Sequence, residues 1–297
     1  MNSYKISVLL LFFVVFLGCK TKKEELKKQH VEVQGHRGDR GNFPENTIPA
    51  FLSAIHKGSD VIEMDVVISK DKKVVVSHET FMSSLYVKTP DGIAIVKEKE
   101  KTYNLYAMNY DSIKKFDSGS NGNPLFPQQK KLKTYKPLLS EVIDSVEKEI
   151  AQNHHKRVMY NIEIKSEKKE YGIHQPQPEE LVDLVMKVIQ QKGIEAFMNI
   201  QSFDPHLLNV LHKKYPKVKI ALLTSKAGID KNLRELTFKP QIYSPNYKLV
   251  NAAFLDSLRV NHIKVIPWTV NDKDAINKML DLKVDGIITD YPERLLN

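Results

Sequence analysis

The chain has 297 residues, 41% of them hydrophobic, and its 45 Lys and Arg against 36 Asp and Glu give a net charge of +9. Its single cysteine, Cys19, excludes a disulfide within the chain. A positive charge is typical of nucleic-acid-binding proteins, but here Lys and Glu are interspersed and no nucleic-acid motif is present. We therefore predict no nucleic-acid partner and interpret the charge as attraction to phosphate-bearing substrates.

The chain begins with a leader made of Lys5, an apolar run over residues 6–17, and Gly18 before Cys19. This run is too short to cross a bilayer, which takes about 20 residues. A short basic start, a short apolar core and a small residue before a cleavage site are typical of a secretory signal. We predict a signal peptide over residues 1–18 and a solvated basic tether over residues 19–30.

The segment FLGC, residues 16–19, resembles the lipobox of bacterial lipoproteins, in which the cysteine becomes the acylated first residue. The Leu that usually lies three places before the cysteine is Phe16 here. The resemblance implies that Cys19 is lipidated and anchors the protein to a membrane of the bacterial cell envelope, on its periplasmic or cell-surface side. The alternative is an ordinary secretion signal that leaves a free thiol.

After the tether, short apolar runs alternate with helical patterns, which is typical of βαβ units and a parallel sheet. The predicted strands cover residues 31–35, 61–67, 159–164, 198–203, 220–224, 241–244, 264–269 and 286–289. The predicted helices cover residues 47–57, 140–149, 179–191, 205–214, 252–260 and 272–282. These strands and the length of the segment favour one (β/α)8 TIM barrel over residues 31–297.

One apolar run, residues 74–78, follows the second strand too soon to be another parallel strand. Parallel neighbours need a connection of about a dozen residues, and only residues 69–73 intervene. We therefore predict an antiparallel hairpin over residues 66–78. A turn at residues 70–73 would pair residue 69 with residue 74, and so Asp65 with His78.

Residues 79–136 form a long insertion after this hairpin, rich in Lys, Ser, Asn and Tyr. Connections of this length are usually functional or disordered. Because the insertion leaves the chain directly after His78, we predict that it forms a rim beside the active site. Its tyrosines, Tyr86, Tyr103, Tyr106 and Tyr110, offer flat faces for a cationic alcohol such as choline.

Charged residues lie within and just after two of the predicted strands. Glu63 and Asp65 are two residues apart and face the same side, as do Glu163 and Lys165. Three carboxylates converging at the carboxyl ends of barrel strands would repel one another, and a divalent cation would remove that repulsion. Oxygen ligands favour Mg²⁺ or Ca²⁺ over Zn²⁺. The alternative is a salt-bridge network of the three carboxylates with Arg37 and Lys165.

Basic groups come from the same predicted end of the barrel. Arg37 can bind phosphate oxygens through two nitrogens and Lys165 acts as a point charge. His36 and His78 come from different segments and can share acid and base roles near neutral pH. Asp290 ends the last predicted strand.

The other histidines are not predicted to bind metal. His154 and His155 are adjacent and so point apart, and they precede the third strand, at the end of the barrel away from the active site. The rest have no acidic or cysteine partner at ligand spacing, and we predict that they are surface or packing residues: His30, His56, His174, His206, His212 and His262.

Several segments together resemble the glycerophosphodiester phosphodiesterases. HRGDRGNFPENT, from His36, is similar to their HRG-x-x-G-x-x-PENT signature, and EMDVVISKDKKVVVSHE, from Glu63, resembles their E-x-D-V…T-K-D-G…V-V-x-H-D segment. NIEIK, QSFDP, WTVND and DGIITDYP recur in the family in this order. Ser69, Lys72 and Glu79 depart from the pattern, where the family has Thr, Gly and Asp, and none of these changes removes a catalytic group.

The resemblance, which covers residues 31–297, implies a (β/α)8 barrel that cleaves glycerophosphodiesters to glycerol 3-phosphate and an alcohol. It implies that His36 and His78 are the acid and the base, without saying which is which. It places one divalent cation, Ca²⁺ or Mg²⁺, on Glu63, Asp65 and Glu163. The nucleophile is either water or the glycerol 2-hydroxyl of the substrate.

The resemblance also implies outer parts of the site. Arg37 and Lys165 would contact the phosphate, and Trp268 would line the pocket, the alternative for Trp268 being a core position. Glu45 and Asn46 of the PENT segment would support the site from behind, with Asn46 or Thr47 capping the first helix.

Two other functions stay open from sequence. One is a lysophospholipase D or phospholipase C-like activity on lipids that keep an acyl chain. The other is an inactive surface barrel that binds glycans or proteins, against which the complete set of histidines, carboxylates and basic residues argues. The oligomeric state is not predicted.

Overall fold

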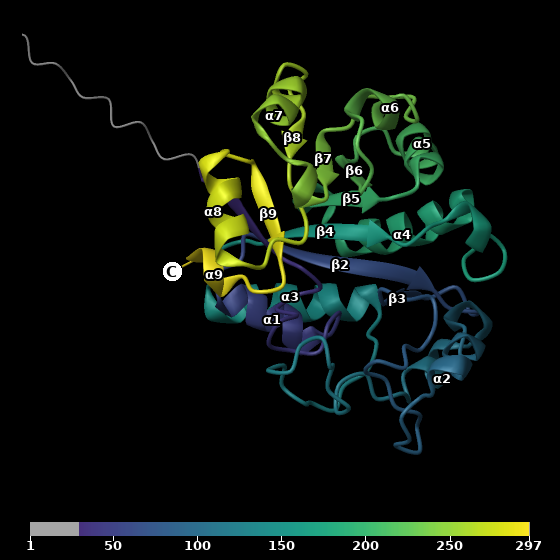
Figure 1. Ribbon diagram of the computed structural model, residues 1–297. Coiled ribbons are helices and arrows are strands. Elements are labelled where there is room, and N and C mark those ends of the chain that lie inside the picture. Colours follow the sequence, from purple (N-terminus) through teal and green to yellow (C-terminus); the bar gives the residue numbers. More distant parts are fainter. Residues whose placement is uncertain (1–29, 297) are drawn as a thin grey trace, which may run out of the picture.

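The computed structural model describes residues 30–296 and consists of strands enclosed by helices (Figure 1). The strands are β1 Glu32–Gly35, β2 Val61–Ile68, β3 Val74–Val76, β4 Met159–Ile164, β5 Met198–Ser202, β6 Ile220–Thr224, β7 Ile242–Pro245, β8 Lys264–Val265 and β9 Gly286–Thr289. The helices are α1 Ile48–His56, α2 Tyr110–Ile113, α3 Leu139–Asn153, α4 Pro178–Lys192, α5 Pro205–Lys214, α6 Ile229–Leu233, α7 Ala252–Arg259, α8 Lys273–Asp281 and α9 Glu293–Leu296.

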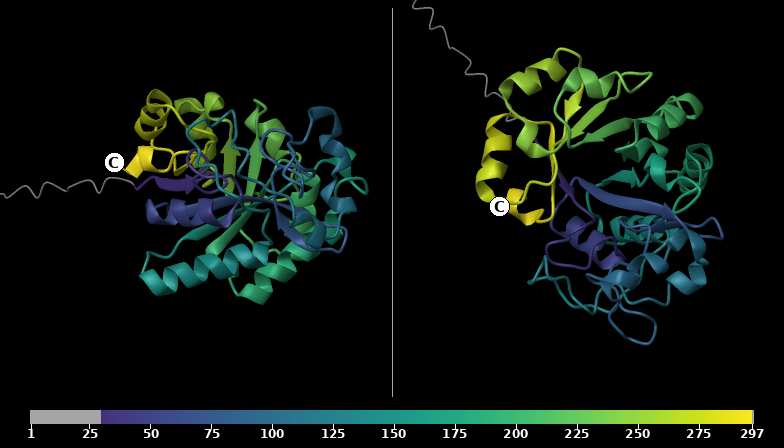
Figure 2. Two further views of the ribbon diagram at one scale, coloured as in Figure 1. Left: turned by 90° about the horizontal axis from the view of Figure 1, so that it is seen from below. Right: turned by 45° about the vertical axis from the view of Figure 1, so that its right-hand side comes forward.

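Eight of the strands are parallel and follow one another around a barrel in the order β8-β7-β6-β5-β4-β2-β1-β9. The two ends of this order are joined by backbone hydrogen bonds: Asp285 N donates to Val265 O at 3.0 Å, and Ile288 N donates to Pro267 O at 3.0 Å. The views in Figure 2 show the helices on the outside of the strands. The predicted (β/α)8 TIM barrel is confirmed.

The strand predicted over residues 264–269 is shorter than expected. The regular strand β8 ends at Val265, two residues before Pro267, which has no N–H to donate to a ladder. The chain nevertheless keeps its course, because Ile266 N donates to Tyr243 O at 3.2 Å and Trp268 N donates to Pro245 O at 3.0 Å. Trp268 therefore lies at the carboxyl end of the barrel.

The predicted hairpin is confirmed, but its register is displaced by one residue. Strand β3 pairs antiparallel with β2 through Val66 and Val76, so that Ser77 N donates to Asp65 O at 2.9 Å. The turn has three residues instead of four, because Ser69 N donates to Lys73 O at 3.0 Å and Lys72 adopts a φ of 60°. The family's glycine at this position suits that left-handed conformation. Asp65 therefore lies opposite Ser77 and not His78.

The helices pack an apolar stripe against the strands, as their sequence periodicity predicts. In α1 the buried residues are Ala50, Phe51, Ala54 and Ile55. The predicted side-chain cap on α1 is wrong: Thr47 is the N-cap residue, but its hydroxyl donates to Pro44 O at 2.6 Å. Asn46 is likewise engaged elsewhere, since its side chain bonds Asp65.

The insertion over residues 79–136 packs beside β2 and β3 around a small core of its own (Figure 1). That core includes Met82, Tyr86, Leu105, Tyr110 and Phe116 from the insertion, and Val67 and Val75 from the outer side of the hairpin. The expectation that the tyrosines offer their faces to a cationic alcohol is therefore wrong for Tyr86 and Tyr110, which are buried in this core. A segment with an apolar core of its own is ordered by that burial.

Within residues 30–296, no helix is both long enough and apolar enough to cross a membrane. The predicted signal peptide, Cys19 and all of the tether except His30 lie outside the described residues.

Candidate active site

The predicted site residues meet at the carboxyl ends of the strands, around a cavity of about 310 Å³. From the predicted set, the cavity is lined by His36, Arg37, Glu63, His78, Glu163, Lys165 and Trp268. Arg40, Gln201 and Phe203 line it as well. These seven residues come from β2, from β4 and from the segments that follow β1, β3, β4 and β8, and up to 232 positions separate them in sequence.

The three carboxylates of Glu63, Asp65 and Glu163 form a buried cluster, with one oxygen from each lying within 4.8 Å of the others. The register explains the convergence: Asp65 lies directly beside Glu163 across the parallel pair β2–β4, and Glu63 is on the same face of β2 two residues earlier. Burial, followed by the charges of Asp65 and Glu163, raises the pKa of Glu63 well above its ordinary value. The cluster is costly without a compensating cation.

The polar atoms of the cluster fit an oxygen-liganded cation. Glu63 Oε2 accepts from Arg37 N at 2.8 Å and Glu63 Oε1 from Gln201 Nε2 at 3.0 Å. Asp65 Oδ1 is buried and accepts no hydrogen bond from residues 30–296. An orphaned carboxylate oxygen is rare in protein interiors, and a Ca²⁺ or Mg²⁺ ion would use it as a ligand.

Arg37 contacts both the carboxylate cluster and the PENT segment. Its Nη1 donates to Glu45 Oε1 at 2.6 Å, and its Nε lies 3.3 Å from Asp65 Oδ2. Glu45 also accepts from Arg40 Nε at 2.7 Å, and Asn46 Nδ2 donates to Asp65 Oδ2 at 2.8 Å. Glu45 and Asn46 of the PENT segment therefore contact Arg37 and Asp65, and two side-chain nitrogens of Arg37 face protein carboxylates.

Lys165 is the second basic residue on the cavity wall. Its Nζ lies 2.6 Å from Glu163 Oε1 and 3.8 Å from Asp65 Oδ1. Burial lowers the pKa of Lys165, but the charges of Glu163 and Asp65 outweigh it and leave the pKa above its ordinary value. Lys165 is thus cationic at neutral pH.

His36 is held by a residue for which no role was predicted. Its Nδ1 lies 2.7 Å from Asp290 Oδ1, while Asp290 Oδ2 accepts from Asn271 Nδ2 at 2.6 Å. Burial lowers the pKa of His36 below its ordinary value, and Asp290 opposes that shift. His36 is therefore neutral at pH 7. The sequence places Asp290 at a strand end, but only the pairing of β1 with β9 brings it to His36.

His78 has a carboxylate partner too, from the adjacent residue. Its Nδ1 lies 3.1 Å from Glu79 Oε1, and Glu79 Oε2 accepts from Tyr86 OH at 2.6 Å. Behind them, the buried Lys136 Nζ donates to Ser77 Oγ at 2.8 Å and lies 3.4 Å from Tyr86 OH. Tyr86 and Lys136 belong to the insertion, which therefore braces His78 through Glu79.

Two aromatic residues, Phe203 and Trp268, also line the cavity. Trp268 Nε1 donates to Ser244 O at 2.9 Å, and its ring meets Phe203 edge-on at 5.3 Å between centroids. Trp268 is only partly buried, which agrees with a pocket wall better than with a core position. Such faces suit an apolar part of a ligand.

A second cavity of about 290 Å³ shares His78, Glu163, Lys165 and Phe203 with the first. Its other lining residues are Glu79, Thr80, Phe81 and Lys101 from the insertion and Ser166, Glu167, Glu170, His174 and Gln175 after β4. His78 thus stands between the two cavities. The insertion forms part of the wall of the second, as a rim would.

Comparison with known proteins places this chain in a family. The Glycerophosphoryl diester phosphodiesterase family matches residues 36–294. A curated relative named Glycerophosphodiester phosphodiesterase, from Caldanaerobacter subterraneus subsp. tengcongensis, is 32% identical over 266 residues, which are 89% of this chain and 96% of the relative.

Two solved structures have the same fold. One, of a protein from Silicibacter pomeroyi assigned to the glycerophosphoryl diester phosphodiesterases, has a TM-score of 0.79 and 25% identity over 90% of this chain and 92% of its own. The other, an Oleispira antarctica phosphodiesterase in complex with the product sn-glycerol-3-phosphate, has a TM-score of 0.69 and 21% identity over 89% and 94%.

Proposed function

The chain belongs to the glycerophosphoryl diester phosphodiesterase family and is an enzyme that hydrolyses phosphodiesters, and we propose that it does so on the residues described above with one divalent cation. The reaction releases glycerol 3-phosphate and an alcohol from a glycerophosphodiester. One observation carries the proposal: the same cavity is lined by both histidines, by Lys165 and by two of the three carboxylates.

The cation would be held by Glu63, Asp65 and Glu163, whose oxygens already lie within 4.8 Å of one another. When bound, a Ca²⁺ or Mg²⁺ ion supplies positive charge for the phosphate oxygens and polarises an oxygen that it contacts. The orphaned Asp65 Oδ1 and the raised pKa of Glu63 support this assignment over a salt-bridge network, because Lys165 reaches that oxygen only at 3.8 Å.

Lys165 and Arg37 would hold the phosphate. Lys165 presents a compact charge on the cavity wall, next to the cluster. Arg37 acts mainly through its charge, since its Nη1 and Nε face Glu45 and Asp65. Arg40 also lines the cavity, and its charge adds to the attraction for an anionic diester.

We assign the base to His36 and the acid to His78. His36 is neutral, and with Nδ1 turned to Asp290 its Nε2 is left to take a proton from the attacking hydroxyl, either of water or of the glycerol 2-position. His78 stands between the two cavities, with Glu79 on its Nδ1. It can protonate the oxygen of the alcohol as that alcohol leaves into the second cavity.

A release assay tests the proposal. The purified protein is incubated with glycerophosphocholine, glycerophosphoethanolamine, glycerophosphoglycerol and lysophosphatidylcholine, with and without added cation. Glycerol 3-phosphate is measured enzymatically for the three diesters, and released choline is measured for the lysolipid, whose other product keeps the acyl chain. We expect release from the three diesters and little hydrolysis of the lysolipid. Hydrolysis of the lysolipid alone would favour a lysophospholipase D, and no hydrolysis of any substrate would favour the inactive surface barrel.

The rim should select the alcohol. Phe81 and Lys101 line the second cavity from the insertion, whereas the phosphate is held in the first. Phe81→Ala is therefore expected to change the relative kcat/KM of the choline and glycerol diesters by about three- to tenfold, since a ring beside a cation contributes roughly 0.5–2 kcal/mol. Deleting residues 97–122 is a poorer test because it removes Leu105, Tyr110 and Phe116 from the insertion's core.

Inhibition by glycerol 3-phosphate, the common product, should be unchanged in Phe81→Ala. Leu125→Ala, an exposed position elsewhere in the insertion, is the matched control. A Phe81→Ala enzyme that ranks the diesters as the parent does would rule out this role of the rim.

We further propose that the protein is a lipoprotein of the bacterial cell envelope, with residues 1–18 as its signal peptide and residues 19–30 as a tether to the barrel over residues 31–297. Cys19 supports this, because it follows an apolar run of signal-peptide length. Cys19→Ser should move the protein from the membrane fraction to the soluble fraction, because each buried acyl CH₂ contributes about 0.8 kcal/mol. Immunoblots of both fractions give the answer, and an unchanged distribution would contradict lipidation.

A further inference from the structure

A second group of side chains with metal-binding chemistry lies at the other end of the barrel. His56 is the last residue of α1, Glu149 is in the last turn of α3, and His155 follows α3 by two positions. These segments precede β2 and β4, so they lie at the amino ends of the strands, away from the catalytic cavity. We call these three residues the His–Glu–His cluster.

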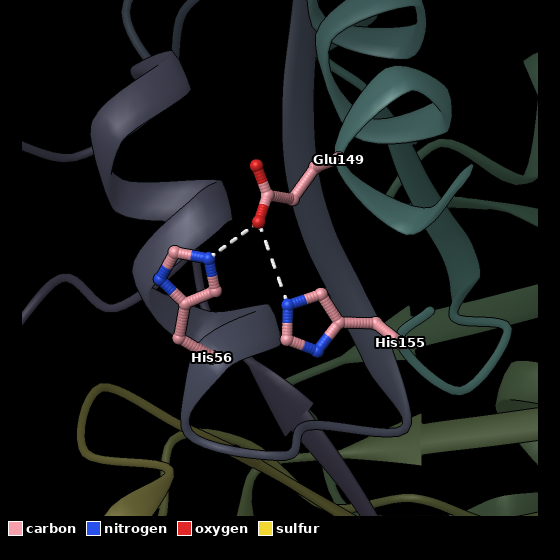
Figure 3. Close-up of side chains that lie close together, drawn as sticks. All are labelled: His56, Glu149 and His155. Atoms are coloured by element: carbon pink, nitrogen blue, oxygen red, sulfur yellow. Dashed lines mark hydrogen bonds and ion pairs between the residues drawn. The ribbon is translucent and has the colours of Figure 1, made fainter. Parts of the chain in front are cut away.

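Both imidazoles of the cluster turn toward one carboxylate oxygen (Figure 3). His56 Nε2 lies 2.7 Å and His155 Nε2 lies 3.4 Å from Glu149 Oε1. The prediction that His56 has no acidic partner is therefore wrong. Of the adjacent residues His154 and His155, only His155 belongs to this cluster, where it meets His56 and Glu149.

The fold holds the three side chains together without any ion. Helices α1 and α3 pack against each other along the barrel wall. His154, at a φ of 52°, ends α3 in the left-handed conformation and lets the chain turn back. The two rings then lie 5.2 Å apart between centroids, inclined by 34°, with the carboxylate between their nitrogens.

The spacing and the atom types suit a transition-metal ion. Ligands about 2.0–2.1 Å from a tetrahedral centre are about 3.4 Å apart, and the two measured separations are 2.7 and 3.4 Å, with one ligand atom from each residue within 4.8 Å of the others. Imidazole nitrogens favour zinc and its neighbours, whereas Ca²⁺ and Mg²⁺ prefer oxygen. We propose that His56, Glu149 and His155 bind a divalent transition-metal ion, Zn²⁺ in the first place, with water in the remaining position.

The carboxylate of Glu149 is held in place by a hydrogen bond from a neighbouring residue. Asn153 Nδ2 donates to Glu149 Oε1 at 2.6 Å and fixes the orientation of the group, as outer partners of metal ligands do. Glu149 is largely shielded, with 15% of its side chain exposed, while the side chains of His56 and His155 are 53% and 30% exposed. An ion from solution can therefore reach the cluster.

A bound ion would tie the end of α1 to the end of α3. Residues at the amino ends of barrel strands serve stability, while catalysis occurs at the carboxyl ends. The ion should consequently raise the unfolding temperature and leave turnover of glycerophosphodiesters unchanged, because an ion that binds only the folded state stabilises it.

The test is zinc binding to the whole protein, purified without a histidine tag and stripped with chelator. ZnCl₂ is titrated by calorimetry in the presence of excess Ca²⁺, which competes for the carboxylate cluster in the catalytic cavity. Wild type is compared with His56→Ala, His155→Ala and the double variant. His30→Ala is the matched control, because His30 is an exposed histidine that pairs with an acid, Asp60, outside the cluster.

We expect wild type and His30→Ala to bind one zinc ion that the double variant does not bind. Each single variant should lose at least about tenfold in affinity, since even outer partners of a metal ligand contribute 10–100-fold. Co²⁺ should give visible absorption bands that disappear with His56→Ala. Circular dichroism and the unfolding temperature without metal verify that the variants fold.

Equal zinc stoichiometry and affinity in wild type and the double variant would overturn the proposal. The proposal would also be overturned if the wild-type protein bound no zinc in excess Ca²⁺. The His–Glu–His cluster would then be only a hydrogen-bonded group between two helix ends. A zinc-dependent rise in the unfolding temperature of wild type and His30→Ala, absent from the double variant, would support it.

Discussion

Glu63→Gln is expected to lower kcat/KM for glycerophosphocholine by about a thousandfold or more, and removal of divalent cations from the wild type should have the same effect. Glutamine cannot supply the anionic oxygen that a cation needs, and charge stabilisation by a metal contributes several kcal/mol to such reactions. Release of glycerol 3-phosphate, measured before and after chelation and after adding back Ca²⁺ or Mg²⁺, tests both statements. Glu195→Gln, at an exposed position on the surface, is the matched control.

The Glu63→Gln protein should remain folded. Burial and the neighbouring carboxylates raise the pKa of Glu63, so its ionised form is disfavoured in the folded state, and a neutral side chain of the same shape relieves that cost at neutral pH. Without cation, the unfolding temperature of the variant should equal or exceed that of wild type. Added Ca²⁺ should raise the unfolding temperature of wild type only. Full wild-type activity in excess chelator would contradict the metal assignment.

His36→Ala and His78→Ala should each lower kcat by about 10²–10⁴-fold, the usual contribution of a general acid or base. Both side chains line the cavity, and each has a carboxylate on its Nδ1, from Asp290 and Glu79 respectively. His30→Ala is the control, and circular dichroism establishes that the variants fold. If either single variant kept more than about a tenth of the wild-type activity, the acid–base assignment of that histidine would be excluded.

Asp290→Asn separates positioning from catalysis. Asp290 opposes the lowering of the His36 pKa, so its loss should lower that pKa further. A base with a lower pKa stays unprotonated to lower pH, and the acidic limb of the kcat/KM profile should therefore move to lower pH while kcat falls. A purely structural role for Asp290 would lower activity without moving that limb.

The barrel could be predicted from sequence because each of its strands is a local signal. The parallel strands are nearly continuous runs of apolar residues, since both faces are covered, and the helices between them have a 3.6-residue period. The hairpin followed from the short spacing alone. Its register did not, because the turn length depends on whether Lys72 adopts the left-handed conformation, which a lysine rarely does.

Glu63 and Asp65 illustrate what sequence determined about the site. Their spacing of two on a strand put both on one face, and barrel geometry put that face at the cavity, so the carboxylate cluster was predicted residue by residue. His36 and His78 were placed at the same end of the barrel by the same argument, and the family resemblance then implied that they are the acid and the base. The placement of these residues needed only the period of a strand and the direction of the chain.

Asp290 beside His36, Tyr86 and Lys136 behind Glu79, and His56 beside Glu149 were decided by tertiary structure alone. The partners are separated by 254 positions in the first case and 93 in the last, and no local pattern links them. They meet because β9 closes the barrel onto β1, because the insertion folds back on the hairpin, and because α1 packs on α3. Periodicity determines which face a side chain occupies, but only the packing of whole elements determines which side chain it meets there.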